Sequence, residues 1–164
     1  MKKMLFFLVI LMLLGSNFAL AEPYRVFDYA DIFTEDEEIA LEEMILDFQM
    51  DAAMDFVVLT RNEQSSEEPR NTADDFYDSN DFGMGKNKSG ILYYIDMYNR
   101  LPYLSTTGEM IDCMTDMRLQ YAHEIVYDHL SSGEYAKAVE HMIVVVKAYV
   151  YDGIPCGQFR YSVE

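Results

Sequence analysis

Residues 91–95 read Ile91-Leu92-Tyr93-Tyr94-Ile95, an unbroken run of apolar and aromatic side chains. A run without a polar face is typical of a central strand that helices cover on both sides. A second run, Phe56-Val57-Val58-Leu59, is rich in branched residues and predicts another buried strand over 55–60. After a turn at 96–100, residues 101–107 are expected to return as the hairpin partner of the 91–95 strand.

Helical patterns surround these strands. Thr34 and Glu37 form the signature of a capping box, and apolar residues at helical spacing follow, which predicts a helix over 35–51. Further helices are predicted around 72–77, from Thr115 or Asp116 to Leu130, and from Tyr135 to Tyr149. The helix between the first two strands predicts a right-handed crossover that makes them parallel. We therefore expect the α/β class, as a three-layer α/β/α sandwich with a small mixed sheet.

The first 21 residues have the pattern of a signal peptide. Lys2 and Lys3 precede an apolar run over 5–14, and Ala19-Leu20-Ala21 is the small-x-small pattern cut by signal peptidase. The alternative is an uncleaved anchor, although the run is short for a span of ~20 residues. We expect cleavage after Ala21, a domain over 22–152, a loose tail over 153–164, and a secreted protein that acts outside the cytoplasm.

Charge is the next informative property. The chain carries 12 basic and 29 acidic residues, and loss of Lys2 and Lys3 with the signal leaves 10 against 29, a net charge of −19. A surface this negative repels phosphate backbones and anionic lipids, which argues against nucleic-acid partners and favours divalent cations or basic partners. The alternative interpretation is that the charge only keeps a secreted protein soluble.

The cysteines and histidines do not form a known metal motif. Cys113 and Cys156 have no CxxC spacing, and whether they form a disulfide is left open by the sequence. His123, His129 and His141 fall on helices without the HExxH spacing. We expect His129 to pack and the other two histidines to lie on the surface.

A set of short motifs, in order along the chain, resembles the TPM domain family. These motifs are Asp28-Tyr29-Ala30-Asp31-Ile32-Phe33, Ala73-Asp74-Asp75-Phe76-Tyr77-Asp78, Gly83-x-Gly85, Gly90-Ile91-Leu92, Arg100, Ser105-Thr106-Thr107-Gly108, Thr115-Asp116 and Gly133-Glu134-Tyr135-Ala136-Lys137-Ala138. Together they cover most of residues 26–150.

The resemblance implies an exported bacterial member of a family of α/β/α domains. It further implies binding of calcium or a similar metal, a role near membrane-protein assembly or repair, and a phosphatase activity that has been reported for the family. Two features differ from the family pattern. Position 89 is Ser where relatives often carry an acidic or amide residue, and neither a transmembrane helix nor a Gly-rich tail follows the domain. We therefore expect no transmembrane segment after signal cleavage.

Topology predicts a cluster of carboxylates. The segments 80–90 and 105–116 flank two antiparallel strands and should meet at one edge, and both are acidic. The proposed ligands of a divalent metal such as Ca²⁺ are Asp75, Asp78, Asp81 and Asp116. The alternative is that Asp116 only caps its helix and that the other acids are solvated.

Two functions fit these expectations. The first is a non-enzymatic accessory domain that binds a protein partner at the cell envelope, with exposed aromatic residues as contacts: Tyr24, Tyr98, Tyr103, Phe159 and Tyr161. The second is a metal-dependent phosphomonoesterase that uses the same carboxylates, with Asp116 and Asp81 as ligands. Arg100 is the nearest phosphate clamp, but the topology puts it at the opposite end of the 91–95 strand. No nucleotide cofactor is expected, because Gly83-x-Gly85 lacks a third glycine and precedes a strand.

Overall fold

The computed structural model describes residues 24–158 as one α/β domain. The signal peptide predicted for residues 1–21 and residues 159–164 of the predicted tail lie outside the described residues. The elements follow in the order β1 (Val26–Asp28), α2 (Glu35–Ala52), β2 (Asp55–Arg61), α3 (Pro69–Ser79), β3 (Gly90–Asp96), β4 (Leu101–Thr107), α4 (Met110–Cys113), α5 (Asp116–Ser132) and α6 (Tyr135–Asp152).

The sheet has four strands in the order β1-β2-β3-β4. β2 and β3 are parallel, with Phe56 opposite Ile91, and the helix α3 connects them. β3 and β4 are antiparallel, with Tyr93 opposite Leu104. The mixed sheet predicted from the sequence is confirmed, and β4 is one of its two edge strands.

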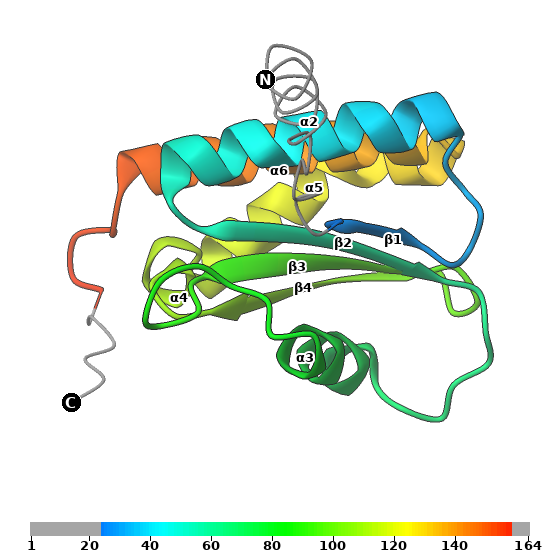
Figure 1. Ribbon diagram of the computed structural model, residues 1–164, viewed down its shortest axis with the longest axis horizontal. Helices are drawn as coiled ribbons and strands as arrows, with labels where there is room; N and C mark the ends of the chain where they lie inside the picture. The colour runs from blue at the N-terminus through cyan, green and yellow to red at the C-terminus, as the bar shows by residue number, and fades with distance from the viewer. Residues whose placement is uncertain (1–23, 159–164) are drawn as a thin grey trace, which may run out of the picture.

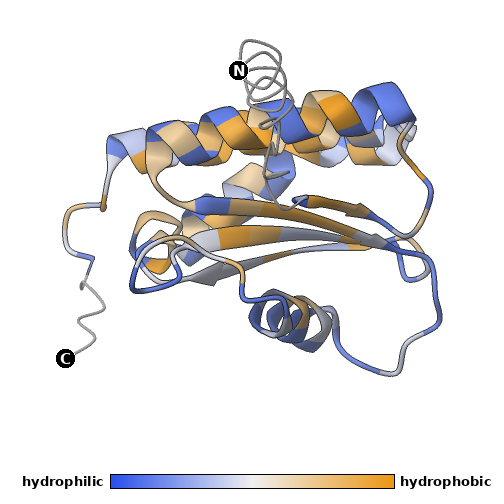
Figure 2. Ribbon diagram, in the orientation of Figure 1, coloured by the Kyte–Doolittle hydropathy of each residue, from blue (hydrophilic) through white to orange (hydrophobic). Residues whose placement is uncertain are grey.

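Helices cover both faces of the sheet, which confirms the three-layer architecture (Figure 1). On one face, Phe56, Val58 and Tyr93 pack under α2, α5 and α6 in the main core. On the other face, Val57 and Leu92 pack under α3 in a smaller core. Alternate residues of β2 and β3 thus serve opposite cores, which explains why neither strand has a polar face. Figure 2 shows hydrophobic residues along these strands, whereas α3 is largely hydrophilic.

Side chains cap two of the helices as the sequence indicated. Thr34 accepts a hydrogen bond from the Glu37 backbone at 3.3 Å, and the Glu37 carboxylate accepts from the Thr34 backbone at 2.8 Å. These two bonds satisfy amides that the first turn of a helix leaves free. The bond from the Thr34 backbone, together with a second bond from the Thr34 hydroxyl at 2.9 Å, lowers the pKa of the Glu37 carboxyl. At α5 the cap is Thr115, which accepts from the backbone of Arg118.

Two short elements and one boundary differ from the prediction. β1 has three residues paired with β2, and α4 is a single turn of four residues. α3 starts at Pro69 rather than near Thr72, because proline has no amide to satisfy at a helix start.

The two cysteines are not bridged: Cys113 is buried and Cys156 is exposed. Between residues 24 and 158, no helix combines the length and the apolar character that crossing a membrane requires.

A candidate binding cleft at the edge of the sheet

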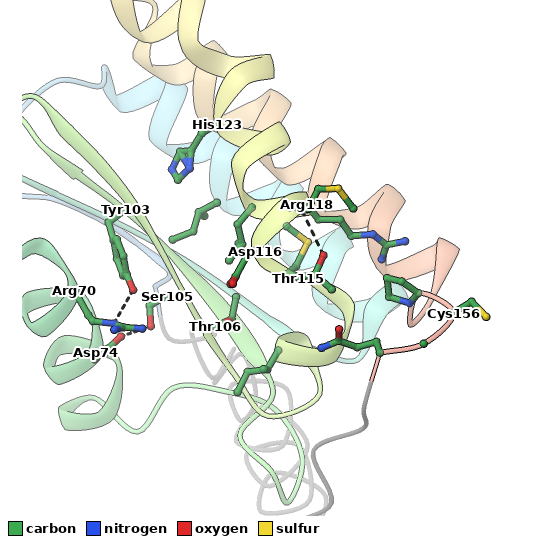
Figure 3. A pocket seen from close by; sticks show the side chains of 18 residues that line it. Arg70, Asp74, Tyr103, Ser105, Thr106, Thr115, Asp116, Arg118, His123 and Cys156 are labelled. Atoms are coloured by element: carbon green, nitrogen blue, oxygen red, sulfur yellow. Dashed lines mark hydrogen bonds between the residues drawn. The ribbon is translucent and has the colours of Figure 1, made fainter.

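A cleft of ≈ 1090 Å³ opens beside the edge strand β4, between α3 and α5. Figure 3 shows its polar side chains, which come from three elements and from the segment after α6. They are Arg70 and Asp74 of α3, Tyr103, Ser105 and Thr106 of β4, Thr115 at the N-cap of α5, Asp116, Arg118 and His123 of α5, and Cys156 and Gln158.

On the α3 side, side-chain hydrogen bonds tie the helix to β4. Arg70 donates through Nε to the Tyr103 hydroxyl at 3.1 Å, and the Ser105 hydroxyl donates to the Asp74 carboxylate. Both contacts are visible in Figure 3. Arg70 and Asp74 lie one helical turn apart, so they contact alternate residues of the strand. This wall of the cleft is therefore polar.

On the α5 side, Arg118 holds three chain segments together. Its Nη1 donates to the carbonyl oxygens of Cys113 at 2.8 Å, Gly153 at 2.8 Å and Tyr149 at 3.2 Å. Its guanidinium also lies over the Tyr149 ring, 4.7 Å from the centroid. Through these contacts the guanidinium of Arg118 joins α4, α5 and the end of α6.

His123 is half-buried behind this wall, and the prediction that it lies on the surface was wrong. Its Nε2 is buried and has no hydrogen-bond partner among the described residues, and its ring lies 6.0 Å from that of Tyr93. Burial lowers the pKa of His123, which favours the neutral imidazole. His129, which was expected to pack, makes a polar contact at 2.8 Å with Glu134, and its ring meets the exposed His141 ring edge to face, with 4.7 Å between the ring centroids.

Of the four predicted metal ligands, Asp116 lines the cleft, whereas the other three lie on α3 or in the loop directly after it. Asp75 and Asp78 are exposed on α3, and the Asp81 carboxylate is 87% exposed and pairs with Lys88 at 2.8 Å. Asp81 and Asp78 are neighbours, because the Asp81 amide donates to the Asp78 carbonyl at 3.2 Å. Asp116 instead lines the cleft together with Asp74. Within residues 24–158 no group of three or more His, Cys, Asp or Glu side chains is arranged to hold a metal ion.

The segments 80–90 and 105–116 do meet, as predicted, but through backbone atoms and one serine. The Ser89 hydroxyl accepts from the Glu109 amide at 3.0 Å, and the Thr107 hydroxyl donates to the Lys88 carbonyl. A Cβ added to Gly108 would lie 2.5 Å from both the Asn87 carbonyl oxygen and the Ser89 hydroxyl, so the two segments touch there. Ser89 fills a structural position at this junction.

The most heavily bonded carboxylate near these segments is Asp55, which the sequence analysis did not select. It is fully buried at the start of β2. Its Oδ1 accepts from Arg25 Nε and from Gln49 Nε2, each at 2.7 Å, and its Oδ2 accepts from the Gly83 amide at 2.8 Å. Asp55 thereby holds the glycine loop and the segment before β1 against the sheet. An acidic residue directly before an apolar run was the available signal.

Arg100 lies in the turn between β3 and β4, where its φ is +56°. It lines a second, smaller cavity of ≈ 380 Å³ with Tyr127 and Tyr135, and it does not line the cleft. The expectation that Arg100 sits away from the proposed site is confirmed.

Comparison with known proteins agrees with this architecture. The TPM domain family model matches residues 26–149. No curated protein matches the chain in sequence.

Three solved NMR structures share the fold. The BA42 protein of Bizionia argentinensis has a TM-score of 0.64 at 15% identity, covering 79% of this chain and 90% of that one. The N-terminal domain of cg2496 from Corynebacterium glutamicum has a TM-score of 0.64 at 13% identity, covering 91% and 95%. The N-terminal domain of a P. gingivalis protein has a TM-score of 0.69 at 18% identity, covering 82% and 87%. The TM-scores show a shared fold at these low identities, and the family model matches most of the described residues: the chain belongs to the TPM domain family.

Proposed function

We propose that this TPM domain is an exported, non-enzymatic accessory module that binds a protein partner at the cell envelope through the cleft between α3 and α5. The observation that carries the proposal is the cleft of ≈ 1090 Å³ beside an edge strand. Large concave surfaces are the usual sites of ligand recognition. Most polar side chains of this cleft are engaged in bonds that shape its walls, which suits a binding surface.

Export is supported by the sequence of residues 1–21. Mass spectrometry of the protein recovered from its native host tests this part of the proposal. A mature protein that starts at Glu22 supports export with cleavage, whereas an intact Met1 in the membrane fraction supports an uncleaved anchor.

Partner binding is tested with a photo-crosslinking amino acid at one of two methionines. Met117 lines the cleft and is 62% exposed, whereas Met50 is 68% exposed on α2 and does not line it. We expect an envelope protein to crosslink at position 117 and not at position 50. The purified partner should then bind the wild-type domain and the Met50→Glu variant but not the Met117→Glu variant. Equal crosslinking at both positions would contradict the proposal.

Calcium binding is a separate proposal, supported by the net charge of −17 and by two aspartates, Asp78 and Asp81, whose backbones are hydrogen-bonded to each other. The described residues do not form a ready-made ligand set, so no step of the binding proposal depends on calcium. Calorimetric titration with CaCl₂ tests it. We expect Asp78→Asn with Asp81→Asn to weaken binding and Asp116→Asn to leave it unchanged, because Asp116 lines the cleft instead.

Metal-dependent phosphomonoester hydrolysis is the alternative function. The observation in its favour is that Arg70, Asp74 and Asp116 line one cleft, which combines carboxylates with a cationic side chain. The proposal of a binding module predicts no hydrolysis of para-nitrophenyl phosphate above the buffer rate with CaCl₂ or MgCl₂. Hydrolysis that requires the metal and disappears in Asp116→Asn would reverse the ranking.

A further inference from the structure

The outer edge of β4 presents backbone groups that no described residue bonds. The Met97 amide donates to the Arg61 carbonyl at 2.8 Å, so odd-numbered residues of β3 direct their backbone polar groups toward β2. Even-numbered residues of β3 therefore bond β4, where the register places them opposite odd-numbered residues. The amides and carbonyls of Leu104 and Thr106 consequently point away from β3, and the described chain supplies no partner for them.

This edge opens into the cleft between two helical layers. Leu104 and Thr106 both line the cleft, whose walls come from α3 on one face of the sheet and from α4 and α5 on the other (Figure 3). An extended segment beside β4 would continue the sheet between these layers and bond the outward groups. Edges of this kind are templates for the addition of a strand from another chain.

β4 already carries a proline at an outward position. Pro102 lies opposite Ile95 of β3, in the same alternation as Leu104 and Thr106. A proline at such a position costs no bond of the ladder, because its nitrogen points away from β3. The outward-pointing amides of β4 are therefore those of Leu104 and Thr106, the two even-numbered residues of the strand that line the cleft.

The two walls of the cleft favour different side chains on the two faces of an added strand. The wall from α4 and α5 contributes the apolar Ile111 and Met117 together with Asp116, which forms no ion pair with a residue that the structure describes. On the α3 wall, Arg70 and Asp74 lie one turn apart, so opposite charges accompany each other there. With a net charge of −17 on the chain, a basic side chain is the complement of Asp116.

We infer that the partner contributes an extended segment that adds to the outer edge of β4 as a fifth strand, with a lysine or arginine beside Asp116. The backbone of this segment bonds Leu104 and Thr106, and its face toward α5 carries apolar side chains on either side of the basic one. The inference rests on the proposed function, to which it adds the chemistry of the partner. In complexes of this kind the main-chain bonds supply affinity and the alternate side chains supply specificity.

A synthetic heptapeptide, acetyl-Thr-Val-Thr-Lys-Thr-Val-Thr-amide, is the probe for this edge. In extended form its seven residues span about 23 Å, the length of the seven-residue β4. Its threonines form one polar face, and valine, lysine and valine form the other. Calorimetric titration into the purified protein measures the Kd, and the absence of saturable binding overturns the inference.

Thr106→Pro and Thr106→Val are a matched pair of variants, because both remove the hydroxyl and only proline removes the outward amide. We expect Thr106→Val to bind the peptide within about twofold of the wild type and Thr106→Pro to bind it at least about fivefold more weakly, since a peptide carbonyl loses its donor. Thermal melts establish that both variants are folded. Equal binding by the two folded variants overturns strand addition.

A modified peptide decides the question even if Thr106→Pro does not fold. Methylation of every backbone nitrogen of the probe removes the donors from both of its edges and keeps its side chains. We expect this peptide to bind the wild-type protein at least about tenfold more weakly, because the outward carbonyls of β4 then lose their donors. Equal affinity of the two peptides overturns strand addition.

The basic side chain is tested by replacing the lysine of the probe with glutamate. We expect at least about threefold weaker binding, because like charges would then lie beside each other. The difference between the two peptides should shrink in Asp116→Asn and persist in Asp81→Asn, since Asp81 does not line the cleft. A difference of the same size in both variants overturns the placement of the basic side chain.

The partner crosslinked at position 117 separates this inference from the proposed function. If that partner binds Thr106→Pro as tightly as Thr106→Val, strand addition is overturned and the proposed function stands. Peptide binding that depends on the Thr106 amide, without any crosslinked partner, supports the edge as a strand acceptor and contradicts the proposed function alone. A dimer in sedimentation that is lost in Thr106→Pro assigns the edge to a second copy of this chain and overturns a separate partner.

Discussion

Two aspartates that contact the glycine loop over 80–90 have opposite surroundings. Asp55 is fully buried and accepts three hydrogen bonds from three separate segments. Asp81 belongs to the loop itself, is 87% exposed, and pairs with one lysine that is itself half-exposed. Of these two carboxylates, the one that supports the fold is the one that accepts more hydrogen bonds. The number of neighbouring acids is not a guide to that role.

The sharpest test of this comparison is Asp55→Ala. The substitution removes the carboxylate that accepts from Arg25 Nε, from Gln49 Nε2 and from the Gly83 amide, and removal of one partner from a buried pair costs about 3–5 kcal/mol. We expect the free energy of unfolding in urea to fall by this amount. Asp75→Ala on the exposed face of α3 is the control and should change it by less than ~0.5 kcal/mol. Equal losses in the two variants would contradict the comparison.

The next effect concerns the glycine loop and the junction beside it, where Gly85 and Gly108 both have positive φ. A Cβ at Gly108 would meet the Asn87 carbonyl oxygen at 2.5 Å, whereas one at Gly85 would meet nothing within 4 Å. Both Gly→Ala variants carry the strain of a left-handed conformation, about 1–2 kcal/mol. Gly108→Ala should lose about 1–3 kcal/mol more in chemical denaturation because its neighbours are backbone atoms. Equal losses of stability in Gly108→Ala and Gly85→Ala would show that the segments 80–90 and 105–116 move apart easily.

A smaller effect is expected from His123 as the pH changes. Its pKa is lowered by burial, so between the folded and unfolded pKa values the unfolded chain binds more protons. The contribution of the neutral imidazole to stability is complete above the unfolded pKa of about 6.5 and is lost as the pH falls toward the folded value. We expect His123→Leu to lose less stability than the wild type between pH 7 and pH 5. Urea unfolding at a series of pH values measures this, and an unchanged slope in His123→Leu would contradict the prediction.

The smallest effect is expected from the exposed ion pair. Asp81→Asn removes the carboxylate that pairs with Lys88 and should change the free energy of unfolding by less than ~0.5 kcal/mol, because solvent screens exposed pairs. Thermal melts at low and high salt measure this. A loss comparable to that of Asp55→Ala would remove the distinction between the two aspartates.

Most of the fold could be predicted from local pattern. Continuous apolar runs identified β2 and β3, the capping box identified the start of α2, and the crossover rule gave the parallel pair. β1 and α4 were missed because three residues and a single turn are too short to show a period. β1 forms by pairing with β2, which is remote in the sequence, and α4 forms directly after the end of β4. Neither dependence is visible as a local sequence pattern.

The candidate site was less predictable because topology brings segments together without directing their side chains. Segments 80–90 and 105–116 meet as predicted, yet Ser89 and backbone atoms make the contact. Metal binding by Asp75, Asp78, Asp81 and Asp116 stays a prediction. The cleft is built from α3, β4 and α5, and no sequence window spans those three elements. His123 was misplaced because one histidine in a helix carries no signal of which face it occupies.

The three carbonyls held by Arg118 have a mechanical consequence. Gly153 and Tyr149 at the end of α6 are joined by one guanidinium to Cys113 and α5. Tension applied to the chain beyond Gly153 would therefore load α5 and the wall of the cleft before it could unwind α6. A pull on that end of the domain is transmitted directly to the wall of the cleft.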